Sequence, residues 1–218
     1  MELRFAQRAR ATKDLDLGIS APRTSRLQTL SAALRLGFDS FTFRLKAQIR
    51  EMEQADTLRV QVAVQYRTRA WQTVEVDLGP APSSAVDLIE PRVRGLVELG
   101  IPVVAPIRCL NLADQIAQKL HACTGPFSAG RACDVLDILL IDLLGELDYP
   151  DATEASRRIF AERATHEFPL TVTFPPEWTP ELEALARELE FPLRTASTME
   201  LRFREVIRKL GRPAHRDE

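Results

Sequence analysis

Hydrophobic and polar residues alternate along three segments in the first half of the chain, at 41–46, 58–66 and 71–78. A period of two predicts strands that are half buried. A short turn at 67–69 makes the second and third segments antiparallel partners. In the third segment the apolar residues at 74, 76 and 78 share one face, whereas Asp77 lies on the other. The first half is therefore expected to form a small sheet.

The segment Arg-Ala-Thr-Lys-Asp-Leu-Asp at 10–16, which runs on into Leu-Gly-Ile-Ser, is also expected to form a strand. Asp14 and Asp16 are two residues apart, so both carboxylates leave the same face, with backbones roughly 6–7 Å apart. Two like charges about 6 Å apart repel by roughly 3 kcal/mol at an effective dielectric near 20. A divalent cation with phosphate oxygens is one way to offset them. The alternative is an ordinary exposed strand end.

Apolar residues at helical spacing dominate the second half. The first half contains one expected helix, which begins at Thr24 or Ser25 and ends at Gly37. Asn111 is the expected N-cap of the next helix, with Asp114 three residues on as a variant of the capping box. The expected helices after residue 110 are 111–123, 131–144, 153–166, 180–190 and 196–210, and short extended segments are expected near 96–99 and 170–174.

The helix expected at 131–144 is apolar nearly all round apart from one arginine and three aspartates. Such a helix should be buried, and a buried acid needs a partner. The elements together predict an α+β chain with a small mixed sheet followed by a helical C-terminal domain. We place the sheet domain at 1–106, the helical domain at 107–212 and a frayed tail at 213–218.

Composition narrows the class of protein. A net charge of -2 argues against a generally basic surface that coats nucleic acid. Three cysteines without a CxxC pair suit a reducing cytoplasm and do not suggest a zinc site. No apolar run approaches the roughly 20 residues of a transmembrane helix, and charges interrupt any signal-peptide pattern at the start. We therefore expect a cytoplasmic protein with no membrane partner.

Three acids on two strands, followed by a helical domain, suit metal-assisted phosphoryl or nucleotidyl transfer. The acids are Asp14, Asp16 and Asp77. Oxygen ligands of this kind favour magnesium over zinc. The chain has no GxSxG motif, no Walker A loop and no Ser-His-Asp order, and its histidines are not at metal-ligand spacing.

Four motifs follow one another along the chain: Arg10-x-Thr-x-Asp-x-Asp16, Val74-Glu-Val-Asp77, Ile116-Ala-Gln-Lys-Leu-His-Ala122 and Arg131-x-x-Asp-x-x-Asp-Ile138. In this order they resemble the AbiEii/AbiGii toxin family of nucleotidyltransferases, and segments 161–169 and 175–178 also resemble its members. The resemblance implies a nucleotidyltransferase fold and a cytoplasmic toxin of a bacterial toxin–antitoxin or phage-defence system. It further implies Mg²⁺, a nucleoside triphosphate substrate, an RNA acceptor such as tRNA, and a cognate antitoxin.

The resemblance also assigns roles to residues of the sheet domain. Asp14 and Asp16 match the metal-binding pair, and Asp77 matches the third acid. Arg10 would contact phosphate or pair with these acids.

In the helical domain, Lys119 matches the lysine that holds triphosphate oxygens. Asp134 matches the proposed catalytic base, with Asp137 and Arg131 as its motif partners in substrate binding. The alternatives are a solvated helix lysine at 119 and, for the other three, a buried ion network that orients the helix.

The chain departs from the family pattern near its start. Members carry a Gly-Gly or Gly-Ser turn roughly ten or more residues before the first motif, where backbone N–H groups hold phosphate. The nine residues before Arg10 contain no glycine. We expect either a misassigned start codon or an N-terminally truncated form with a weakened or absent triphosphate site. The protein is then expected to be either an active Mg²⁺-dependent enzyme or a catalytically silent homologue that only binds a partner such as an antitoxin.

Overall fold

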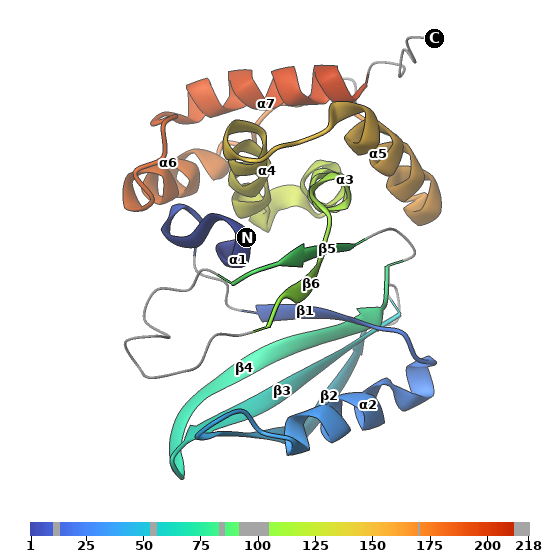
Figure 1. Ribbon diagram of the computed structural model, residues 1–218. Coiled ribbons are helices and arrows are strands. Elements are labelled where there is room, and N and C mark those ends of the chain that lie inside the picture. Colours follow the sequence, from blue (N-terminus) through green and yellow to red (C-terminus); the bar gives the residue numbers. More distant parts are fainter. Residues whose placement is uncertain (11–13, 53–55, 83–85, 92–104, 170, 212–218) are drawn as a thin grey trace. The chain divides into compact units, whose positions relative to one another are not determined.

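A computed structural model of the chain describes residues 1–10, 14–52, 56–82, 86–91, 105–169 and 171–211 (Figure 1). The expected α+β class is confirmed. The strands are β1 (Asp14–Ile19), β2 (Phe41–Met52), β3 (Thr57–Tyr66), β4 (Arg69–Pro80), β5 (Val86–Ile89) and β6 (Ile107–Leu110). The α-helices are α1 (Glu2–Phe5), α2 (Arg23–Arg35), α3 (Leu112–Thr124), α4 (Ala132–Leu144), α5 (Tyr149–Arg163), α6 (Trp178–Glu188) and α7 (Ala196–Leu210).

The described residues group into two compact units. The sheet unit contains 14–52 and 56–82, and the helical unit contains 1–10, 86–91, 105–169 and 171–211. The boundary that we place at residue 106 stays a prediction. The grouping by contacts differs from it because the N-terminal segment and the β5–β6 pair belong with the helices. Phe5, for example, is buried in the same apolar cluster as α4.

The sheet unit is a four-stranded mixed sheet with the strand order β1-β4-β3-β2. Strand β1 runs parallel to β4, whereas β3 is antiparallel to both β4 and β2. The helix α2 lies along one face of this sheet (Figure 1). Its Leu30 packs with buried side chains of β3 and β4, among them Val60 and Leu78. The apolar core therefore fills one face, and the polar positions of the same strands occupy the other.

The expected start of α2 is wrong. The helix begins at Arg23, directly after Pro22, and neither Thr24 nor Ser25 caps it. Because proline fixes its own φ near the value that helix entry requires, the chain enters the helix there without a side-chain cap. The expected end is close to the observed one, because the helix ends at Arg35, two residues before Gly37. Gly37 has a φ of 63°, the left-handed conformation that favours glycine after a helix.

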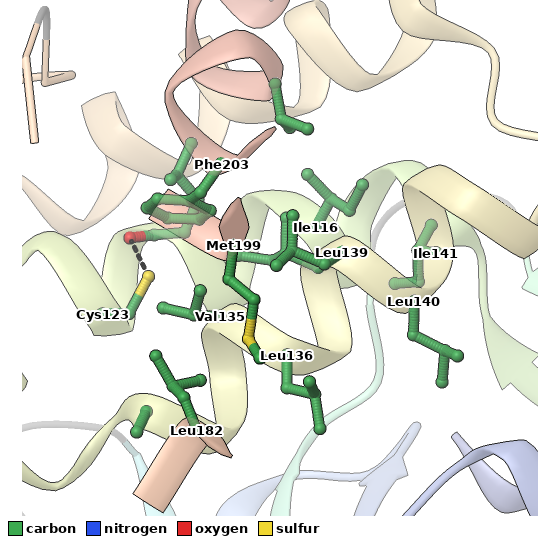
Figure 2. Packing of buried hydrophobic residues seen from close by; sticks show 14 of the residues in the cluster. Ile116, Cys123, Val135, Leu136, Leu139, Leu140, Ile141, Leu182, Met199 and Phe203 are labelled. Atoms are coloured by element: carbon green, nitrogen blue, oxygen red, sulfur yellow. Dashed lines mark hydrogen bonds between the residues drawn. The ribbon is translucent and has the colours of Figure 1, made fainter. Parts of the chain in front are cut away.

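The helical unit is built around α4, which contacts α3, α6 and α7 (Figure 1). Figure 2 shows its apolar side chains, such as Val135 and Leu139, among those of the neighbouring helices. The expected all-round burial of this helix is confirmed. Its third aspartate, Asp142, is 1% exposed and pairs with Arg202 at 2.6 Å.

The other helices of the second half appear as expected, with shifts of a few residues at their ends. The predicted Asn111 cap is confirmed, because the Asp114 amide donates to its side chain at 2.7 Å. No strand forms in 171–174, and the strands β5 and β6 were not anticipated. The segments 96–99 and 213–218 lie outside the described residues. Within the described parts, no helix has the length and apolar character that crossing a membrane requires.

Candidate functional site

Strands β1 and β4 bring the three predicted acids onto one face of the sheet. In the parallel ladder Asp14 is the Cα partner of Glu75, and Asp16 is the Cα partner of Asp77. Side chains of paired residues leave a sheet on the same face, so these four carboxylates share the face opposite the apolar core. Like charges directly opposite one another are destabilising. This face therefore requires positive charge.

Arg59 of β3 supplies part of that charge. It is the cross-strand partner of Asp77. Its Nε and one terminal nitrogen donate to the two carboxylate oxygens of Asp77 at 2.7 and 2.6 Å. The other terminal nitrogen lies 3.1 Å from an oxygen of Glu75. The hydrogen bonds to Asp77 raise the pKa of the Arg59 guanidinium, which stays charged.

The face that carries Asp14, Asp16, Glu75 and Asp77, the acid face, has some but not all of the features of a magnesium site. Its donors suit the ion, because Mg²⁺ prefers carboxylate oxygens. Their arrangement does not, since among the described residues no group of three or more His, Cys, Asp or Glu could hold a metal. Both oxygens of Asp77 are instead bound to Arg59. The structure thus gathers the predicted acids on one face without assembling a cation site there.

The second set of predicted residues meets in the helical unit, between α3 and α4. The Lys119 ammonium lies 3.0 Å from an oxygen of Asp134 and 2.7 Å from an oxygen of Asp137. Arg10 contacts Asp137 at 3.3 Å, and Arg131 contacts Asp134 at 3.5 Å. Asp134 and Asp137 are three residues apart on α4, so their side chains lie on the same side of the helix and both contact Lys119.

Burial separates the members of this network. The side chain of Asp137 is 1% exposed, that of Asp134 is 12% exposed and that of Lys119 is 21% exposed. Burial by itself would lower the pKa of Lys119, but Asp137 and Asp134 outweigh it and raise that pKa above its usual value. Lys119 is therefore a cation at neutral pH. Asp137 is placed to fix it, while Lys119 and Asp134 keep some access to solvent.

The predicted site residues thus form two clusters, one in each unit. Asp14, Asp16 and Asp77 lie on the sheet, and the helical network contains Lys119, Asp134, Asp137, Arg131 and Arg10. The roles assigned to them stay predictions.

Two further residues of the acid face were not identified as site residues from the sequence, Arg59 and Glu75. The alternation in 58–66 puts Arg59 on the polar face, and the same reasoning applies to Glu75 beside Asp77. Alternation does not say which residues stand opposite each other, because that depends on the exact register of the hairpin.

Comparison with known proteins identifies a family and similar solved structures. A family model described as "Nucleotidyl transferase AbiEii toxin, Type IV TA system" matches residues 1–214. Among solved structures, the chain resembles MenT4, a nucleotidyltransferase toxin from Mycobacterium tuberculosis H37Rv, with a TM-score of 0.63 and 14% identity. That similarity covers 98% of this chain and 73% of the MenT4 chain, and at this identity it shows the fold. No curated protein sequence matches.

Proposed function

The chain belongs to the AbiEii nucleotidyl transferase toxin family, and on that premise we propose that it transfers a nucleotide from a nucleoside triphosphate to an RNA acceptor, in a Mg²⁺-dependent reaction. The family is that of a type IV toxin–antitoxin system, which implies a cognate antitoxin. A tRNA is the RNA class that we expect as the acceptor.

The observation that carries this proposal is the parallel pairing of β1 with β4. It sets Asp16 beside Asp77 and leaves Asp14 on the same face, so three residues predicted to act together share one surface. The Mg²⁺ dependence rests on the family premise, because these acids as the structure arranges them do not form a cation site.

The helical network supplies groups for the remaining chemistry. A charged Lys119 can bind oxygens of the triphosphate as a compact point charge. Asp134 can accept the proton of the acceptor hydroxyl. That oxygen then forms a bond to the α-phosphorus, the bond between this phosphorus and the bridging oxygen breaks, and pyrophosphate leaves. The partial exposure of both side chains supports direct contact with substrate.

Asp137 and the two arginines support this pair in different ways. The near-complete burial of Asp137 favours a positioning role, in which it fixes the Lys119 ammonium. Arg131 is 54% exposed and is available to bind phosphate or the RNA backbone. Arg10 stays next to Asp137, which favours a contact with the network over a contact with the acid pair.

The test is transfer of label from each α-labelled nucleoside triphosphate to total RNA, with and without Mg²⁺. We expect Asp14→Asn combined with Asp16→Asn to lower the transfer by about 100-fold or more. The control is Asp39→Asn, which removes one carboxylate charge, against two in the double variant, from an exposed position of the sheet unit. Its φ of 51° suits asparagine, so this control should fold and transfer normally. Transfer that is unchanged in the double variant would show that this assignment is wrong.

A second candidate is a catalytically silent homologue that binds a partner such as the antitoxin. The ion pair between Arg59 and Asp77 favours it, because an arginine bound to the third acid neutralises that acid without a metal. Absence of label transfer with every triphosphate and with Mg²⁺ or Mn²⁺, in a chain that folds normally, would support this candidate over the enzyme.

A further inference from the structure

The end of the sheet at the β3–β4 hairpin carries three aromatic side chains that pack on one another, and these form the aromatic patch. The ring centroids of Phe41 and Tyr66 are 4.9 Å apart, and Trp71 meets both rings edge-on, at 5.9 and 5.8 Å. The hairpin extends beyond the end of α2 (Figure 1), and none of the three rings belongs to the apolar cluster between α2 and the sheet. Trp71 is accordingly 55% exposed. The patch is therefore an aromatic surface that solvent reaches.

Trp71 is the extra residue of an irregularity in the pairing of β3 with β4. The ladder pairs Val64 with Gln72 but Gln65 with Ala70, so Trp71 lies between two paired positions without a partner of its own in the ladder. A bulge of this kind changes the direction of a side chain and is frequent beside functional sites. Here it brings the indole against the other two rings of the patch.

Two arginines lie beside the rings. The guanidinium carbon of Arg67 is 5.2 Å from the centroid of the Tyr66 ring, and Arg69 is the cross-strand partner of Tyr66. Both arginines are exposed, and within the described parts of the chain neither guanidinium forms an ion pair with a carboxylate. In the connection from α2 to β2 the exposed charges of Arg35 and Asp39 offset each other, so the local formal charge is about +2. This end of the sheet is thus positive in a chain whose net charge is -2.

The turn that carries Arg67 has an unusual backbone. The φ of Arg67 is 45° and that of Thr68 is 70°. Two-residue hairpin turns with positive φ at both positions favour pairs such as Asn-Gly or Asp-Gly. A β-branched residue rarely adopts this conformation, and strained residues of this kind cluster at functional sites. The preference of the turn therefore does not explain an arginine at its tip, whereas a contact with a charged ligand does.

Exposed rings with arginines beside them match the chemistry of unpaired nucleotides. Bases stack on aromatic side chains and on guanidinium groups, and arginine binds phosphate in a bidentate manner. A protein partner can also cover aromatic residues, but it needs acidic groups at matching positions to balance the two arginines. An RNA strand carries a phosphate at every nucleotide, so it supplies both features along its whole length.

We propose that the aromatic patch binds an unpaired segment of the RNA acceptor, with a base stacked on Trp71 and with Arg67 and Arg69 bound to phosphates. Trp71 lies six residues along β4 from Asp77, a distance of about 20 Å, so the patch contacts RNA away from the predicted acids. This inference rests on the proposed function, in which an RNA is the acceptor.

The test measures RNA binding alone, without triphosphate. The probe is a fluorescein-labelled single-stranded RNA of about 12 nucleotides, compared with the duplex of the same sequence, and fluorescence anisotropy gives the Kd. We expect the full chain to bind the single strand more tightly than the duplex. Trp71→Ala should raise the Kd for the single strand about tenfold, whereas Trp71→Phe, which keeps a ring, should raise it less than about threefold.

Two further measurements separate stacking from charge. RNA should quench the tryptophan fluorescence of the natural chain but not that of Trp71→Phe, in which the buried Trp178 is the remaining tryptophan. The slope of log K against log salt concentration falls by about 0.7 for each phosphate contact that a single strand loses. Arg67→Gln combined with Arg69→Gln should therefore lower the slope by about 1.4, and Trp71→Ala should leave it unchanged.

Ile49→Ala is the matched control for Trp71→Ala. Ile49 is also a large apolar residue of the same sheet, 43% exposed, but it lies on β2 away from the hairpin end. Because an aliphatic side chain offers no ring for a base, the Kd should change by less than about twofold. Asp39→Asn leaves the rings and both arginines in place, so it should bind RNA at least as tightly as the natural chain.

The outcomes separate this inference from the proposed function. If Trp71→Ala and the double arginine variant bind RNA as tightly as the natural chain, the inference is wrong, and transfer of label by the natural chain would leave the proposed function standing. A loss confined to the arginine variant would overturn the stacking role. RNA binding through the patch, in a chain that transfers no label, would support the patch and contradict the proposed reaction.

Other occupants of the patch would be recognised in the same experiments. If Trp71→Ala dissociates an oligomer of the natural chain without changing its RNA affinity, the patch is an interface between copies of this chain and the inference is wrong. Circular dichroism checks that each variant is folded. If Trp71→Ala does not fold, the quenching and salt-slope measurements, which use Trp71→Phe and the arginine variant, decide the question.

Discussion

Lys119→Met removes a cation that contacts both Asp134 and Asp137 and replaces it with an apolar side chain of similar length. At an effective dielectric of about 20, ion pairs of 2.7 and 3.0 Å correspond to roughly 5–6 kcal/mol of attraction each, before the cost of desolvation. Measured losses on breaking one side of a buried pair are about 3–5 kcal/mol. Because Arg10 and Arg131 still contact the two acids, we expect a loss of about 3 kcal/mol in the free energy of unfolding.

Urea unfolding followed by tryptophan fluorescence measures this loss. The chain has two tryptophans, and Trp178 is buried in the helical unit while Trp71 is 55% exposed in the sheet unit. In a Trp71→Phe background the signal therefore reports on the unit that contains Lys119. Lys209→Met is the matched control, since Lys209 lies 4.0 Å from Glu205 in a partly exposed pair, and it should cost less than about 1 kcal/mol.

A second substitution tests the electrostatic reasoning. Lys119→Met removes one cationic partner of the buried Asp137 carboxylate. Adding Asp137→Asn removes that buried charge and should restore about 1–2 kcal/mol of the free energy of unfolding. A loss below about 1 kcal/mol for Lys119→Met, or no recovery in the double variant, would refute the view that this network stabilises the helical unit. A loss of activity alone would then define Lys119 as a substrate-binding residue.

Three other predictions concern stability, measured in the same assay. Burial and Arg163 lower the pKa of His121 from 6.5 to about 4, so the unfolded chain binds a proton between these pH values that the native chain does not. The free energy of unfolding should therefore fall by about 1–2 kcal/mol as the pH drops from 6.5 to 4, and His121→Gln should flatten that slope. Asn111→Ala should lower the free energy of unfolding by about 1 kcal/mol because it removes the acceptor of the Asp114 amide, whereas Asn111→Ser should retain most of that stabilisation. Gly145→Ala should cost on the order of 1–3 kcal/mol, because its Cβ would lie 2.6 Å from the Ile141 carbonyl oxygen, while Gly130→Ala, with open space at that point, should be near neutral.

Local signals in the sequence predicted part of the helical network, namely that its acids are buried and need partners, but not which residues are those partners. The apolar surroundings of Asp134 and Asp137 predicted burial, and burial predicted partners, which the structure supplies in Lys119 and two arginines. The Asn111 cap follows the same logic, since the side chain and the amide it binds are three residues apart. The cap and the burial of α4 depend on neighbours along the chain, which periodicity reveals, whereas Arg10 and Asp137 are 127 positions apart.

The acid face depends on a longer-range feature. Tyr66 pairs with Arg69, but Val64 pairs with Gln72, so β4 contains one extra residue at this point. Without that β-bulge, Arg59 would stand opposite Val76, and its contact with Asp77 would be lost. The apolar pattern requires such a shift to keep the core on one face, but it does not say where the extra residue lies. The pairing of Arg59 with Asp77 could therefore not be predicted from the sequence.

The position of β1 in the sheet gives its acids a second consequence. β1 ends the strand order, pairing with β4, and Leu15 on its other face is 45% exposed. Strands in this position can pair with strands of other molecules, and charged side chains discourage that association. Asp14 and Asp16 therefore also favour colloidal solubility. A preparation in which both are neutralised is expected to self-associate at concentrations where the natural chain stays dispersed.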